Sequence, residues 1–296
     1  MASGTPTNRT NITLPADVSS EILQKTQEES AIMRLARQIA LPGRGTSINV
    51  ITSDPEATWV GETSAKTVAN PGLSTKLMTP YKLAVIVPFS KEFRRDVASL
   101  YDALVQRLPR ALGLKFDKTV VAGAAPGANF DVFAGCTAQN IGSTPYLSIV
   151  AADTDIATNG GDMNGIALSP AGKGVLLAAL DGENRPLFND VASDGIPRVL
   201  GAPVMITKGA YKAGAASTGT TPAVPNIVGV AGDWTQALYG TVEGVEITYS
   251  EDATLLDSNS NPIYLFQQNM FAVRAEIEIG FRADTNCFNL LTTSVS

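Results

Sequence analysis

Residues 57–62, Ala-Thr-Trp-Val-Gly-Glu, open a polar stretch that leads into an apolar strand and then into the clearest helical pattern of the chain. Turn signals lie at both ends of residues 54–88 and at Asn70-Pro71-Gly72, with strand-like residues between them. The apolar strand covers Leu83 to Val87. This order predicts a long two-stranded hairpin arm that is too polar to carry a core of its own.

A long helix is predicted directly after this arm. Ser90 is a suitable N-cap, and Glu92 falls in the first turn, where the helix dipole favours an acid. We expect Pro109 to kink the helix, because it removes a backbone donor, and Gly123 to end it. Apolar side chains recur every three or four residues and form one stripe: Phe93, Val97, Leu100, Leu104, Leu108, Leu112 and Phe116.

The C-terminal region has the alternating pattern of a half-buried strand over residues 271–282. One face is apolar, and the other carries Arg274, Glu276, Glu278 and Arg282. The two glutamates could act as a carboxylate pair, but the flanking arginines favour a charge-paired solvent or interface face. The apolar face needs an amphipathic partner, and the stripe of the long helix is the expected one.

The other elements are shorter, so the fold class is α+β. Residues 1–14 are polar and are expected to form a mobile tail, and a first helix is expected from Pro15 and Asp17 through Ile39. A second helix should run from Ser169-Pro170 to Leu180, and a buried strand should follow the turn at Leu200.

Composition indicates a globular protein without an obvious catalytic site. The 296 residues are 44% hydrophobic and 17% charged, and no apolar run is long enough to cross a membrane. The absence of histidine removes the usual general base and the commonest zinc ligand. Cys136 and Cys287 are too isolated to form a disulfide framework or a metal pair, as expected for a reducing compartment.

Two other motifs resemble ligand sites but lack the spacing or the ligands that such sites require. Gly172-Lys173-Gly174 lacks the spacing of a phosphate loop. Asp153, Asp155 and Asp162 lack the closing glutamate of a calcium loop, so we expect a solvated loop there. We therefore expect no catalytic residue, no cofactor and no metal.

Charge is divided unevenly along the chain, whose net charge is −6. Residues 1–118 hold 15 Lys and Arg against 11 Asp and Glu, a balance of +4, and residues 119–296 hold 7 against 17, a balance of −10. No acid lies between Glu62 and Glu92. A basic arm could therefore attract the acidic surface of another copy, or it could simply be a solvated loop.

Read in order, the landmarks resemble the major capsid proteins of tailed bacteriophages (the Johnson fold) over residues 15–291. No single landmark is specific, but their shared order and spacing is. The matching segments are Thr58 to Glu62, Ser90 with Glu92 and Asp96, Asp117 to Gly123, Gly201 with Pro203 and Val204, Gly232-Asp233-Trp234, and Phe271 to Phe288.

The resemblance implies five parts. These are an N-terminal arm and helix (1–45), an extended β-hairpin loop (46–88), a spine helix of the peripheral domain (89–125), an axial domain (126–235) and closing peripheral strands (236–296). It also implies self-assembly into hexamers and pentamers of an icosahedral shell around double-stranded DNA. Expected assembly contacts are Trp59, Glu62, Lys66, Lys76, Lys82 and Arg94.

The same resemblance implies a virion protein assembled in the bacterial cytoplasm, with a portal, possible decoration proteins, non-specific contact with DNA and no membrane. Because only a short polar tail precedes the first helix, and Met1 is present, we expect the scaffolding protein to be separate. Some relatives cross-link an arm lysine to a neighbour's asparagine, but the Thr-, Ser- and Gly-rich arm is poorly suited to making a lysine neutral.

Two alternatives stay open. An encapsulin shell would have the same fold but an enzyme cargo, and the neighbouring genes would distinguish it. A hydrolase with an unfamiliar site is the alternative from another class, although without histidine it would need a lysine base.

Overall fold

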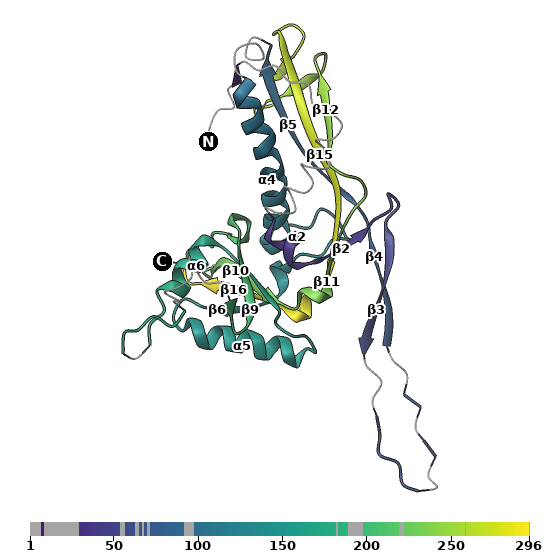
Figure 1. Cartoon of the computed structure of the whole chain (residues 1–296), viewed down its shortest axis with the longest axis vertical. Coiled ribbons are helices and arrows are strands. Elements are labelled where there is room, and N and C mark those ends of the chain that lie inside the picture. Colours follow the sequence, from purple (N-terminus) through teal and green to yellow (C-terminus); the bar gives the residue numbers. More distant parts are fainter. Residues whose placement is uncertain are drawn as a thin grey trace.

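The computed structural model describes residues 7–8, 30–53, 57–62, 65–66, 68–69, 72–91, 98–181, 183–188, 198–218, 222–257 and 259–295. A long helix lies beside a long sheet, a second sheet with its own helices sits at one end of that helix, and a hairpin projects away from both (Figure 1). Within the described residues, no helix is long and apolar enough to cross a membrane.

The first sheet is built around the C-terminal strand predicted from its alternation. Its strands run in the order β1-β5-β15-β11-β2, and β12 also pairs with β15. The pairing of β15 with β5 is antiparallel and extends from Met270 opposite Ser90 to Ile279 opposite Tyr81. The strands are β1 (Thr7–Asn8), β2 (Arg37–Ala40), β5 (Tyr81–Ser90), β11 (Ala237–Thr241), β12 (Glu246–Ser250) and β15 (Met270–Ala283).

Helix α4 (Ala98–Ala122) packs on this sheet, as its stripe predicted. Leu108 and Leu112 are buried in one cluster with Ala275 and Ile277 of β15. The helix ends one residue before Gly123, as expected, and it continues through Pro109. Ser90 is the last residue of β5 and pairs with Met270, and the helix start predicted next to it falls on residues that the structure does not describe. Residues 92–97 lie outside the described part.

The second sheet has the order β6-β16-β10-β7-β9-β8. Its strands are β6 (Thr137–Asn140), β7 (Gly165–Leu168), β8 (Arg198–Val199), β9 (Ala202–Ile206), β10 (Asn226–Gly232) and β16 (Phe288–Thr293). The last strand therefore returns to this sheet, whereas residues 236–296 were expected to stay together in the peripheral part. Residues Phe288 to Thr292 are all buried, and so short a run gives no periodicity that would assign it to one sheet.

Two helices, α5 (Pro145–Thr158) and α6 (Pro170–Leu177), accompany the second sheet. Helix α6 starts as predicted, with the Ser169 side chain accepting from the Gly172 N–H, but it ends before Leu180. Helix α5 was not predicted, although Ile149, Ala152 and Ile156 form its buried face. Its presence corrects the expected solvated loop, because Asp153 and Asp155 lie on the helix.

The projecting hairpin consists of β3 (Thr46–Ser53) and β4 (Gly72–Met78), which pair from Thr46 opposite Met78 to Ser53 opposite Gly72. The expected arm of 46–88 thus includes β5, which belongs to the first sheet. We call residues 46–78 the arm. Four short 3-10 turns and a small hairpin complete the described elements: η1 (Phe133–Gly135), η2 (Lys208–Ala210), η3 (Trp234–Gln236), η4 (Thr285–Cys287), β13 (Thr254–Leu256) and β14 (Pro262–Tyr264).

Two expectations about the N-terminal region need correction. Within the expected tail, Thr7–Asn8 form β1 and pair in parallel with the end of β5. Of the expected first helix, the structure describes only α2 (Ala31–Leu35). This helix ends at Leu35 because the backbone becomes extended at Ala36 and Arg37–Ala40 pair with β11. The strand partner outweighs the helical spacing of Ile39. Most of the expected helix, residues 15–29, lies outside the described residues.

A buried carboxylate joins three parts of the fold. Asp117 of α4 is fully buried and accepts hydrogen bonds from the Ser30 hydroxyl at 2.5 Å and the Thr207 hydroxyl at 2.7 Å. The backbone N–H groups of Ala31 and Ile32 also donate to it. Burial raises its pKa to about 6, although these four donors act in the opposite direction. Asp117 therefore ties α4 to α2 and to the turn after β9.

Candidate assembly surface

The far part of the arm carries apolar side chains that its own chain does not cover. Trp59 is fully exposed, Val68 is 85% exposed and Val60 is also exposed. A tryptophan without intramolecular cover is unusual, because its ring offers a large apolar area to bury. This part of the arm is suited to contact with another molecule.

The polar residues expected to act with Trp59 lie in different surroundings. Glu62 and Lys66 are exposed on the arm. Among the described residues, Lys66 has no ion pair. Arg94 was also expected to be an assembly contact, and it lies outside the described residues.

Lys82 has its partners within its own chain. Its Nζ lies 2.9 Å from Glu276 Oε1 and 3.1 Å from Glu278 Oε1 across the β5–β15 pair. The two glutamates raise the pKa of Lys82, and Lys82 lowers the pKa of Glu276. The interpretation of the charged face of β15 as a paired surface is confirmed.

Lys76 is also held by its own chain. Its Nζ donates to the carbonyl oxygen of Ala283 at 3.1 Å, at the end of β15. Of the three lysines expected to reach a neighbour, only Lys66 therefore lacks a described partner on the same chain.

An acidic depression of about 170 Å³ lies beside the Lys82 pair. Glu243 and Glu246 line it together with Glu276 and Glu278. No group of three or more potential metal ligands occurs among the residues that the structure describes. The depression is a strongly acidic surface feature of the first sheet.

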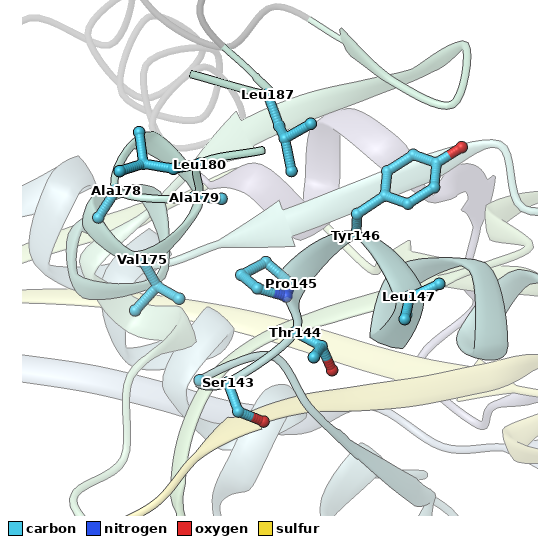
Figure 2. A pocket seen from close by; sticks show the side chains of 11 residues that line it. Ser143, Thr144, Pro145, Tyr146, Leu147, Val175, Ala178, Ala179, Leu180 and Leu187 are labelled. Atoms are coloured by element: carbon cyan, nitrogen blue, oxygen red, sulfur yellow. The ribbon is translucent and has the colours of Figure 1, made fainter. Parts of the chain in front are cut away.

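An apolar groove of about 500 Å³ opens between the start of α5 and the end of α6. Tyr146 and Leu147 line it from α5, and Leu180 and Leu187 line it from the chain after α6, as Figure 2 shows. All four side chains are at least 45% exposed. Sequence reasoning missed this groove because it missed α5. The Thr144-Pro145 helix start, followed by two large apolar residues, was the available signal.

We expect no covalent links between subunits. Lys76 is engaged with Ala283, and Asn289 is fully buried with its amide donating to the Ala152 carbonyl oxygen, so neither can readily react with another copy. Denatured particles should give one gel band near 30.9 kDa. A ladder that survives boiling and reductant would contradict this expectation.

The described part of the chain has a projecting arm and uncovered apolar surface, and it contains no recognisable reaction centre. The sequence profile of the Phage capsid family matches residues 10–286, which is nearly the whole chain. The chain belongs to the Phage capsid family. Membership makes it a structural subunit of a capsid shell.

Individual phage proteins agree with this membership. The probable major capsid protein gp17 of Mycobacterium phage D29 is 24% identical, with 96% of this chain and 91% of the relative covered. The major capsid protein of Staphylococcus phage 80alpha is 25% identical, with 93% and 83% covered. A solved structure from Mycobacterium phage Ogopogo has a TM-score of 0.72 at 21% identity, with 90% and 92% covered. The α+β Johnson fold of this capsid family, predicted from the sequence, is confirmed.

Proposed function

We propose that this chain is the major capsid protein of a tailed phage and that copies of it close an icosahedral head around double-stranded DNA. The observation that carries the proposal is the arm, whose far part presents Trp59 and Val68 fully or largely exposed. Exposed apolar side chains on a two-stranded projection are stabilised when a neighbouring copy covers them.

The proposed mechanism is geometric. The second sheet with α5 and α6 would form the axial domain, and several copies would surround each hexamer or pentamer axis. The first sheet with α4 would form the peripheral domain. The arm of each copy would lie on the next copy and lock it in place, with Trp59, Glu62, Lys66 and Arg94 among the contacts.

The remaining partners follow from the same proposal. A separate scaffolding protein, a portal and any decoration proteins would act with the shell during assembly in the host cytoplasm. Contact with DNA would be weak and independent of base sequence, since the net charge is −6. We propose no catalytic role.

Electron microscopy of purified particles tests this proposal. Chain co-expressed with its scaffolding protein should form closed icosahedral particles with a multiple of about 60 copies. Particles from infected cells should contain double-stranded DNA. A chain that stays monomeric at high concentration with scaffolding protein would refute the shell function. A shell filled with an enzyme instead of DNA would support the encapsulin alternative.

A further inference from the structure

One arginine of the first sheet forms hydrogen bonds with the base of the arm. The Nε and Nη2 atoms of Arg282 in β15 donate to the carbonyl oxygen of Leu77 in β4 at 2.8 and 2.7 Å. Its Nη1 donates to Asp131 at 2.7 Å, and its Nη2 also donates to Asn129 at 3.1 Å. One guanidinium thus connects the arm, the closing strand and the segment that follows α4.

The arginine is itself held in a fixed orientation. The second carboxylate oxygen of Asp131 accepts from the backbone N–H of Ala283, and the Asp131 N–H donates to the carbonyl oxygen of Phe281. The Arg282 side chain is only 12% exposed, so solvent screens this pair less than a surface ion pair. A charge-assisted, forked set of hydrogen bonds fixes direction as well as distance.

Close packing restrains the other strand of the arm at the same place. Gly45 has a φ of +81°, and a Cβ there would collide with the carbonyl oxygen of Met78. Met78 is fully buried beside Gly280, where a Cβ would leave no room for its side chain. Both strands therefore leave the body from a tightly packed base, and Lys76 adds its bond to Ala283.

The orientation of the base determines where the end of the arm lies, because a small rotation at the base moves the distant end by several ångströms. From Thr46 to Ser53 a strand extends about 24 Å, so a rotation of about 10° at the base displaces its end by about 4 Å. Side-chain packing and hydrogen bonds tolerate only displacements much smaller than this ~4 Å. The angle at the base therefore decides whether the exposed far part can meet a given surface on a neighbour.

We propose that Arg282 is the positioning residue that sets the angle of the arm before assembly, and through it the curvature of the shell. The second half of this proposal rests on the proposed shell function, whereas the first half concerns the single chain. Lysine could keep the pair with Asp131 but could not also hold the Leu77 carbonyl, because its ammonium lacks the planar fork.

Spin-label distances in the unassembled full chain test the first half. Labels at Ser74→Cys on the arm and Lys115→Cys on α4, in a Cys136→Ser/Cys287→Ala background, should give one narrow distance. Arg282→Lys and Arg282→Met should at least double the width of the distribution. Arg274→Lys is the matched control, because Arg274 lies on the same face of β15 and binds Glu276 and Thr248 rather than the arm. Unchanged widths in both Arg282 variants would overturn the proposal.

Particle shape tests the second half. With the melting temperature unchanged in Arg282→Lys, electron microscopy should show mixed particle sizes and open shells, and Arg274→Lys should give normal ones. Normal particles from an Arg282→Lys chain with a broadened distance would overturn the link to curvature. If the parent chain forms no shells, the proposed function fails, and the distance measurement still decides whether Arg282 sets the arm.

Discussion

Replacing residues 54–71 with a two-residue Asn-Gly turn should abolish shell formation and leave the subunit folded. Ser53 and Gly72 face each other across the hairpin, so a two-residue turn can join β3 to β4 without changing their register. The replaced segment contains Trp59, Glu62 and Lys66 but none of the described buried core residues. The melting temperature of the soluble chain should change by no more than a few degrees, while electron microscopy should find no closed particles.

A second variant separates the reach of the arm from its side chains. A Gly/Ser loop of the same length in place of residues 54–71 keeps the reach but removes the apolar contacts. We expect it to fail in assembly as well, since the far part would have nothing to bury on a neighbour. Normal shells from the short-turn variant would show that the far part of the arm is dispensable. Normal shells from the Gly/Ser variant would show that the side chains of this part are dispensable.

The parts of the fold that could be predicted are those whose signal is long and periodic. The face of β15 and the stripe of α4 each extend over several repeats, and the packing of Leu108 and Leu112 on β15 follows from them. Helix α5 and strand β16 carry only short runs, and the partner of β16 lies in a strand more than fifty residues earlier. For such segments the tertiary partner decides the structure, and local sequence does not identify it.

Of the candidate assembly surface, the exposed tryptophan was predictable and the apolar groove beside α5 was not. A tryptophan in a polar, turn-flanked stretch has no local partner, so its exposure could be expected from the sequence. Lysines differ, because a long flexible side chain can reach any acid that the register brings near. Lys82 meets Glu276, 194 residues away, and Lys76 meets the Ala283 carbonyl, 207 residues away. Both contacts depend on strand pairings that the charge pattern does not reveal.

Asp117 was recognised in the sequence only as a family landmark, but in the structure it contributes to the stability of the fold. It is the single acceptor for donors from Ser30, Ala31, Ile32 and Thr207, which come from two other parts of the chain. Asp117→Ala would leave these buried donors without an acceptor, at a cost of about 3–5 kcal/mol. This is a large part of the stability of a typical domain, so the variant should unfold at markedly lower denaturant concentration.

The pH dependence of Asp117 gives the sharper test. Its pKa in the folded chain is about 6, above the ordinary value of 3.8, because burial penalises the charged form. The folded chain therefore binds this proton more tightly than the unfolded chain. The resulting stabilisation is complete below pH 3.8 and is lost as the pH rises through 6, a change of about 3 kcal/mol. Asp117→Asn cannot titrate and serves as the reference, since all other carboxylates are shared. Urea unfolding of the soluble chains from pH 4 to pH 8 should show the stability of the parent falling relative to Asp117→Asn. A constant difference across this range would mean that Asp117 stays ionised, with its four donors outweighing its burial.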